Sequence, residues 1–172
     1  METKRISRLC TLLLLSAAPL AAQSECKPIF EALDKVMGTP THFYVTNDAG
    51  AKPKTIETIY HDGSIYTNAD GKWIKAPYTT KQVADQEQES RRKTVYLCSY
   101  VKEEMVNGHK AAVYSTHTSQ LTGDKTDGQM WISKDTGLPL RNEADSIPGG
   151  KNAKKTHYSV RYDYSDVVPP KL

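Results

Sequence analysis

The 172-residue sequence has few of the residues that build a large apolar core. It contains only two phenylalanines beside ten tyrosines, and hydrophobic residues make up 38% of it, below the usual share of a globular protein. No apolar run is long enough to cross the roughly 30 Å hydrocarbon core of a bilayer. Charge of one sign is not in excess either, because 23 basic residues face 20 acidic ones. This balance argues against wholesale disorder, and we expect one folded, soluble domain.

The motifs of the common enzyme and metal-binding classes are also missing. There is no G-x-S-x-G elbow, P-loop, G-x-G-x-x-G, H-E-x-x-H or EF-hand loop. The five histidines are dispersed, and none has a second His or Cys at ligand spacing, although sheet neighbours could still bring His117 and His157 together. We therefore expect no enzyme activity, no cofactor and no metal site.

The first 22 residues have the pattern of a secretory signal peptide. Lys4, Arg5 and Arg8 precede a short apolar stretch, Leu9–Ala18, and small residues follow up to a cleavage site near Ala22. Residues 1–22 are thus expected to be removed, which leaves one domain at 23–172. The segment carries three basic residues and one acidic residue, so the formal charge falls from +3 to about +1. Such a charge provides no basic surface for nucleic acid.

Two cysteines, Cys26 and Cys98, remain in the expected mature chain. Thiols that reach an oxidising compartment usually pair, and no C-x-x-C spacing or adjacent His favours the alternative of a redox or metal pair. We predict a structural disulfide between Cys26 and Cys98.

Two helices are expected. Apolar residues at helical spacing follow Pro28, which suits a first helical turn, and Gly38 with Pro40 ends the pattern. A second, polar helix is expected from Thr80 to about Arg92, with Thr79 and Gln82 forming a capping box. The basic runs at 91–93 and 151–155 are interpreted as solvated faces or loop.

The rest of the chain is typical of short strands joined by turns. Asn107-Gly108 is the strongest hairpin signal, and Asp62-Gly63 is another. The sequence therefore predicts an α+β fold with about eight strands in an antiparallel meander. Nine segments are candidates for these strands: His42–Thr46, Thr55–Tyr60, Ser64–Thr67, Lys72–Ala76, Thr94–Val106, His109–Thr118, Gly128–Ser133, Leu138–Ala144 and Thr156–Tyr164.

The two tryptophans, Trp73 and Trp131, each lie within an expected strand. One interpretation is that they pack in the core or at the edge of the sheet. The other is that they line an apolar ligand pocket, since aromatic side chains provide a large contact area.

Three segments resemble one family, the periplasmic lipoprotein-carrier-like (LolA-like) half-barrel proteins. Met130–Arg141 resembles their W-I-D-x-x-T-G-L-P-L hairpin, with Ser133 where that pattern has Asp. Tyr162–Pro169 is similar to the Y-x-Y-x-D-x-x-x-P strand that closes many of them, and Glu104–Ala111 to their E-x-V-N-G-x-x-A hairpin. No residue here matches the arginine that gates the carriers.

The resemblance implies a strongly curved antiparallel sheet, a half-barrel, whose concave side holds helices and an apolar cavity. It also implies a periplasmic location and an apolar or acyl ligand, such as a lipid or lipoprotein chain. We hypothesise a monomeric, non-enzymatic binding protein with Trp73 and Trp131 as candidate lining residues. The alternative is a protein–protein interaction module that uses a sheet edge or a tyrosine-rich face and binds no lipid. A hydrolase with scattered His and Asp residues is a weaker third hypothesis.

Overall fold

A computed structural model describes residues 20–48, 52–150 and 153–172 of the chain. Most of the predicted signal peptide, residues 1–19, lies outside these ranges. The described residues form two helices and nine strands. In chain order these are α1 (Leu20–Met37), β1 (Thr41–Asn47), β2 (Lys54–His61), β3 (Ser64–Ala69), β4 (Lys72–Thr79), α2 (Thr80–Lys93), β5 (Thr94–Val106), β6 (His109–Gln120), β7 (Lys125–Ser133), β8 (Pro139–Ile147) and β9 (Thr156–Asp163).

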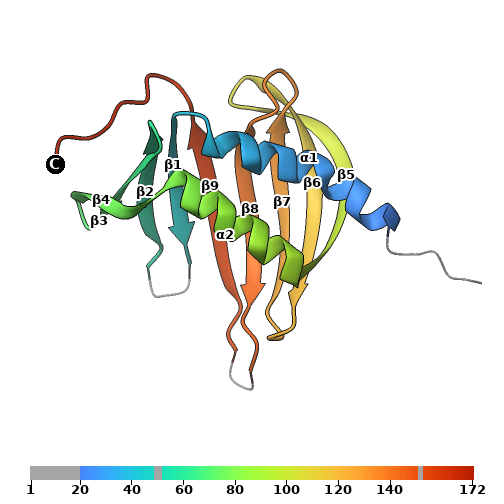
Figure 1. The fold of residues 1–172 in the computed structure, drawn as a ribbon. Helices are drawn as coiled ribbons and strands as arrows, with labels where there is room; N and C mark the ends of the chain where they lie inside the picture. Colours follow the sequence, from blue (N-terminus) through green and yellow to red (C-terminus); the bar gives the residue numbers. More distant parts are fainter. Residues whose placement is uncertain (1–19, 49–51, 151–152) are drawn as a thin grey trace, which may run out of the picture.

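The strands form one open, curved antiparallel sheet, which confirms the predicted α+β half-barrel. Both helices lie against one side of it, the concave face, and α2 runs across that face from β4 to β5 (Figure 1). The strand order is β4-β3-β2-β1-β9-β8-β7-β6-β5. The prediction of one sequential meander was therefore wrong in one respect. Two meanders meet where β1 pairs with β9, a contact between distant segments that no local turn signal encodes.

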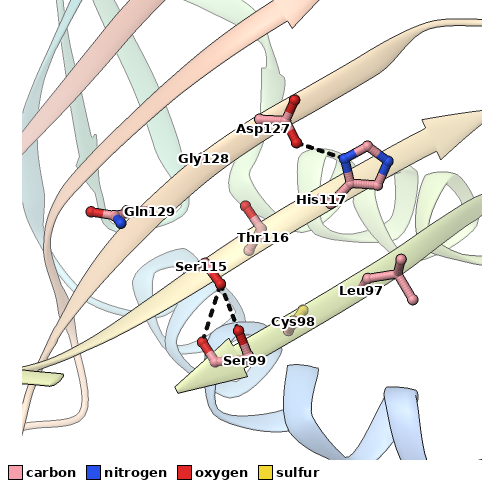
Figure 2. Close-up of a pocket in the computed structure, with 9 residues that line it drawn as sticks. All are labelled: Leu97, Cys98, Ser99, Ser115, Thr116, His117, Asp127, Gly128 and Gln129. Carbon is pink, nitrogen blue, oxygen red and sulfur yellow. Dashed lines mark hydrogen bonds and ion pairs between the residues drawn. The ribbon is translucent and has the colours of Figure 1, made fainter. Parts of the chain in front are cut away.

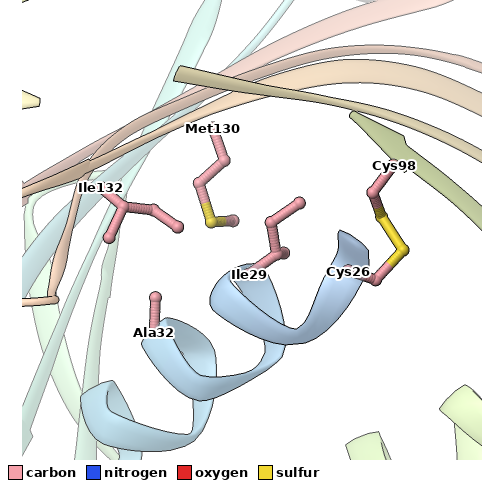
Figure 3. Packing of buried hydrophobic residues seen from close by; sticks show 6 residues of the cluster. All are labelled: Cys26, Ile29, Ala32, Cys98, Met130 and Ile132. Atoms are coloured by element: carbon pink, nitrogen blue, oxygen red, sulfur yellow. A yellow bond between two sulfur atoms is a disulfide. The ribbon is translucent and has the colours of Figure 1, made fainter. Parts of the chain in front are cut away.

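Helix α1 begins eight residues before Pro28, which lies inside the helix rather than in its first turn as predicted. Proline lacks only one backbone N–H, and the residues before it form helix readily, so the helix continues through it. Its buried face packs on the sheet (Figure 3). The cluster there comprises Cys26, Ile29, Ala32, Cys98, Met130 and Ile132. The Cys26–Cys98 disulfide that the sequence predicts is part of this cluster, and it ties α1 to β5.

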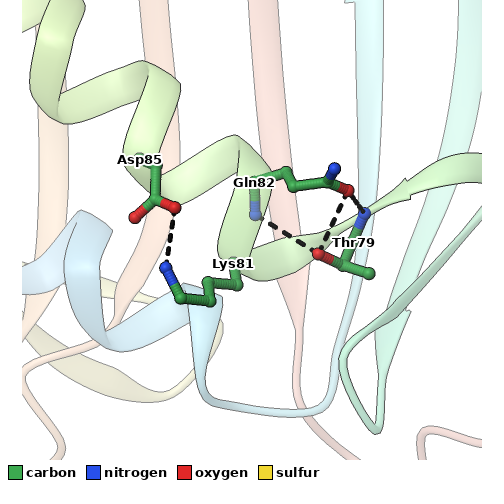
Figure 4. Close-up of polar contacts among 4 residues, drawn as sticks. All are labelled: Thr79, Lys81, Gln82 and Asp85. Atoms are coloured by element: carbon green, nitrogen blue, oxygen red, sulfur yellow. Dashed lines mark hydrogen bonds and ion pairs between the residues drawn. The ribbon is translucent and has the colours of Figure 1, made fainter.

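The start of α2 has the predicted capping box (Figure 4). The Gln82 backbone N–H donates to the Thr79 hydroxyl at 3.3 Å, and the Thr79 N–H donates to the Gln82 side chain at 2.8 Å. One turn later Lys81 pairs with Asp85 at 2.7 Å. These contacts satisfy backbone donors that a helix leaves unpaired at its start, so α2 is stabilised locally rather than by an apolar stripe.

The turn signals of the sequence correspond to left-handed backbone. Asp62-Gly63 joins β2 to β3, and Asn107-Gly108 joins β5 to β6. Asn107 has φ 50° and Gly108 has φ 83°, the values that a type I′ turn requires. The hairpin at 107–108 is therefore confirmed.

Replacing Gly108 with valine should destabilise the domain by more than about 1 kcal/mol, because a β-branched residue is strained at positive φ. Lys110→Ala, two residues into β6, is the control and should be near neutral. Chemical denaturation measures both. Equal midpoints for the two variants would show that the turn conformation contributes nothing measurable to stability.

Candidate ligand-binding site

The concave face is divided between its two helices. Helix α1 fills its own part with apolar side chains, since Val36 packs with Tyr60, Ile65 and Leu138 in a second cluster beyond that of Ile29. Helix α2 does not fill the space in this way. Its one buried residue is Thr80, and Val83 is a partly buried apolar side chain that packs against the second cluster.

Small side chains occupy the concave face along two rows of neighbouring strand positions. One row runs from Cys98 on β5 to Tyr158 on β9, and the next begins at Tyr96. Apart from Cys98, Tyr158 and Tyr96, these rows consist of Thr116, Gly128, Ala144, Thr118, Thr126, Ser146 and Thr156. Gly128 has no room for a side chain, because a Cβ there would lie 2.8 Å from the Glu143 carbonyl oxygen. The side chains in these two rows, which form the floor of the site beneath α2, therefore extend only a short distance from the sheet.

Arg91, near the end of α2, points inward. Its side chain is only 12% exposed, whereas that of the adjacent Arg92 is 76% exposed. The Arg91 guanidinium pairs with Asp34 of α1 at 2.8 Å and with Glu87 at 3.3 Å. The interpretation of residues 91–93 as a solvated face is thus wrong for Arg91. Arg91 and Asp34 are 57 residues apart in the sequence and meet only through the tertiary fold, so the basic run alone gives no signal of this contact.

An aromatic platform supports the Arg91 guanidinium. Its Cζ lies 4.8 Å from the centroid of the Phe30 ring, and Tyr96 meets Phe30 edge-on at 5.0 Å. Burial, followed by the nearby Glu87 carboxylate, raises the pKa of Tyr96. Burial likewise raises the pKa of Tyr158, the other large side chain at the end of a small-residue row.

One nitrogen of this arginine remains without a partner. The Arg91 Nη2 atom is buried and has no hydrogen-bond partner among the described residues. A buried charged donor in this state is costly unless another group accepts its hydrogen bond. The site therefore combines an apolar and aromatic wall, a floor of small side chains, and one cationic donor free to bind an oxygen acceptor.

Both tryptophans lie on the convex face, on the side of the sheet opposite the helices. Trp131 is 5% exposed and packs with Ala111 and Val113, while its indole N–H donates to Glu104. The Trp73 ring lies 5.9 Å from that of His42. Neither tryptophan lies on the wall around Arg91, and a role for either in ligand binding stays a prediction.

The convex face also carries a shallow pocket of about 480 Å³ across β5, β6 and β7 (Figure 2). His117 there pairs with Asp127 at 2.6 Å, and Asp127 is the direct cross-strand neighbour of Asp145, which pairs with His157 at 3.0 Å. The sheet therefore places His117 and His157 in one row with two aspartates between them. Within the described ranges, no three His, Cys, Asp or Glu residues are arranged to hold a metal ion.

Among the described residues, no helix has the length and apolar character needed to span a membrane.

No protein-family model matches the chain, and no curated protein matches it. Among solved structures, LprF from Mycobacterium bovis is 10% identical, with 87% of this chain and 97% of that chain covered and a TM-score of 0.48. MucB, in a complex with MucA(peri), is 15% identical, with 81% of this chain and 56% of that chain covered and a TM-score of 0.45.

A proposed outer membrane lipoprotein-sorting protein domain from Vibrio parahaemolyticus is 7% identical. The match covers 86% of this chain and 95% of that chain, with a TM-score of 0.34. Structures described as a lipoprotein-sorting protein domain and as a LolA superfamily protein are thus among the matches. With TM-scores below 0.5, these similarities carry no ligand, partner or residue role over to this chain.

Proposed function

We propose that this chain is an exported, periplasmic and non-enzymatic binding protein, with residues 1–22 as a signal peptide and 23–172 as a monomeric binding domain. Its ligand is an apolar or acylated molecule, held on the concave face beneath α2. The Cys26–Cys98 disulfide supports an oxidising compartment.

The observation that carries the proposal is the polar helix α2 above a floor of small side chains. A helix without an apolar stripe gains little by packing on a sheet, so its displacement from that sheet costs little. An acyl chain in the same place would bury apolar surface against Tyr96 and Tyr158, and that burial is favourable. Arg91 would then donate from Nη2 to the oxygen atoms of the ligand's polar end.

Chain-length dependence tests the proposal. Delipidated protein is titrated calorimetrically with saturated fatty acids from octanoate to stearate. Affinity should rise by up to about 0.8 kcal/mol for each methylene group, less the cost of ordering the chain, until the site is full. Equal affinities across the series, or no binding at all, would remove the support for an acyl ligand.

A matched pair of arginine variants tests the site. Arg91→Gln should weaken the binding of a fatty acid by about tenfold, because a charge-assisted hydrogen bond is lost, and should affect the corresponding fatty alcohol less. Arg92→Gln, the exposed neighbour, should affect neither ligand. An equal effect of Arg91→Gln on acid and alcohol would place the polar end of the ligand elsewhere.

One observation favours a second candidate, a protein-interaction module. Exposed large apolar side chains gather on β5, which forms one edge of the sheet. They are Val95, Leu97, Tyr100, Val101 and Met105. An edge strand offers unpaired backbone groups to a strand of a partner. This candidate predicts no dependence on acyl chain length, so the same titration separates the two.

A further inference from the structure

A row of aromatic and cationic side chains crosses the convex face, away from the site proposed above. Cross-strand pairing places Trp131, Arg141 and Arg161 next to one another on β7, β8 and β9. The row continues through Tyr44 on β1 to Glu57 on β2. These residues share one face because directly paired strand positions point to the same side of a sheet.

The two arginines at the centre of the row are direct cross-strand partners. Such partners have Cβ atoms about 5 Å apart, and like charges so placed are destabilising unless something neutralises them. Arg141 pairs with Glu143, but Arg161 forms no ion pair with any described residue. One positive charge of the pair is therefore uncompensated.

Aromatic rings hold both guanidinium groups. Arg141 lies over the Trp131 ring, with its Cζ 4.9 Å from the centroid, and Arg161 lies over the Tyr44 ring at 3.9 Å. His42 fixes Tyr44 in turn, by ring stacking at 4.3 Å. Stacking on a ring orients a guanidinium and leaves the N–H groups at its edge available. Arg161 can therefore still donate hydrogen bonds to a ligand.

The arginines line a groove of about 400 Å³ that also reaches the turn between β5 and β6. Its other walls are the hydroxyl groups of Thr46 and Ser159 and the apolar side chains of Val106 and Leu140. Among the described residues that line the groove, Glu143 is the one with an acidic side chain, and Asp163 follows Arg161 two positions along β9. The groove thus has a cationic centre with hydroxyl donors on one side and an apolar wall on the other.

We propose that this groove binds an oxyanion, a carboxylate or phosphate group, between Arg141 and Arg161. The planar forks of the guanidinium groups match such an anion in a bidentate manner, and its charge relieves the repulsion between the paired arginines. The Val106 and Leu140 side chains accommodate an apolar part of the same ligand. The anion comes from a small organic molecule or from a lipid headgroup.

The soluble arm of the test uses phenyl phosphate and benzoate. Trp73→Phe leaves Trp131 as the one tryptophan of the chain, so its fluorescence reports on events at Arg141. We expect a saturable change for the soluble probes, and Arg161→Gln should raise the Kd by about tenfold or more. Arg92→Gln, on α2, is the charge-matched control and should leave the Kd unchanged.

The second arm uses vesicles of phosphatidylcholine with and without phosphatidylglycerol. Binding to the anionic vesicles alone, lost in Arg161→Gln, identifies a lipid headgroup as the source, whereas Arg161-dependent binding of the soluble probes identifies a small molecule. Absence of saturable binding in both arms, or an equal Kd with and without Arg161, overturns the proposal. Because Arg161 is exposed, its replacement should leave the fold intact. Tyr44→Phe keeps an aromatic ring beneath the Arg161 guanidinium and tests whether the ring alone is enough to hold it.

This inference is independent of the acyl-ligand proposal. Arg161→Gln should leave the chain-length dependence of fatty acid binding unchanged, and Arg91→Gln should leave the binding of phenyl phosphate unchanged. The two sites can therefore fail separately.

Discussion

Reduction of the Cys26–Cys98 disulfide should lower the free energy of unfolding by about 4 kcal/mol, the largest single effect expected in this domain. The two cysteines are 72 positions apart, so the bond removes a large loop-closure entropy from the unfolded chain. Both residues are also buried in the cluster that joins α1 to the sheet. Loss of the bond therefore leaves α1 attached to β5 by side-chain packing alone.

Chemical denaturation with and without a reductant measures this effect. The double variant Cys26→Ala/Cys98→Ala is the control, because the reductant should not change its stability. It should also match the reduced natural sequence to within the effect of the lost sulfur atoms. Identical denaturation midpoints for the oxidised and reduced forms would show that the bond contributes nothing to stability.

Alkaline pH should also destabilise the domain strongly, through three tyrosines of one cluster. Burial, with a smaller contribution from Tyr78, raises the pKa of Tyr60 to about 12. Burial also raises the pKa of Tyr162 and of Tyr164, whose hydroxyl group donates to the Pro139 carbonyl oxygen at 2.6 Å. All three hydroxyl groups thus keep their protons in the folded state at a pH where they ionise in the unfolded chain.

The sign of the effect follows from proton binding. Above pH 10 or so, the ordinary pKa of tyrosine, the unfolded chain loses protons that the folded chain retains. The free energy of unfolding should therefore be undiminished below that pH and fall above it, by up to about 1.4 kcal/mol per pH unit for each tyrosine. For Tyr60 the fall should end near pH 12.

Tyr60→Phe tests this expectation by urea denaturation across the alkaline range. The variant should reduce the slope above pH 10 by up to about 1.4 kcal/mol per pH unit, the share of one tyrosine, and change stability little at neutral pH, where the hydroxyl group is protonated in both states. A slope equal to that of the natural sequence would show that Tyr60 ionises equally easily in the folded and unfolded states.

Local features of the fold could be predicted from the sequence because short segments determine them. Asn107-Gly108 favours left-handed backbone by itself, and Thr79 with Gln82 caps a helix whatever the helix packs against. The pairing of Cys26 with Cys98 was predictable because two thiols allow one intramolecular bond. Each of these inferences needs no knowledge of distant segments.

The features that define the sites could not be predicted, because they depend on register between strands. Arg141 meets Arg161 only when β8 and β9 pair in one particular alignment. A shift by one residue would move either side chain to the other face of the sheet. The orientation of Arg91 similarly depends on where α1 places Asp34 and Phe30. The sequence alone does not show which arginines are buried against other side chains and which are exposed. Only the fold distinguishes the two cases.

The pairing of β1 with β9 has a consequence for the order of folding. His42 pairs with Asp163, so the seam that unites the two halves of the sheet closes nearly the whole described chain into one loop. Contacts of such long range form slowly, and among the described strands β9 comes last in the chain. The Cys26–Cys98 bond involves neither β9 nor the seam, so it can form before β9 pairs with β1. Once joined, the two cysteines keep α1, and with it the neighbouring β1, close to the half of the sheet that β9 will complete, which shortens the search for the final seam.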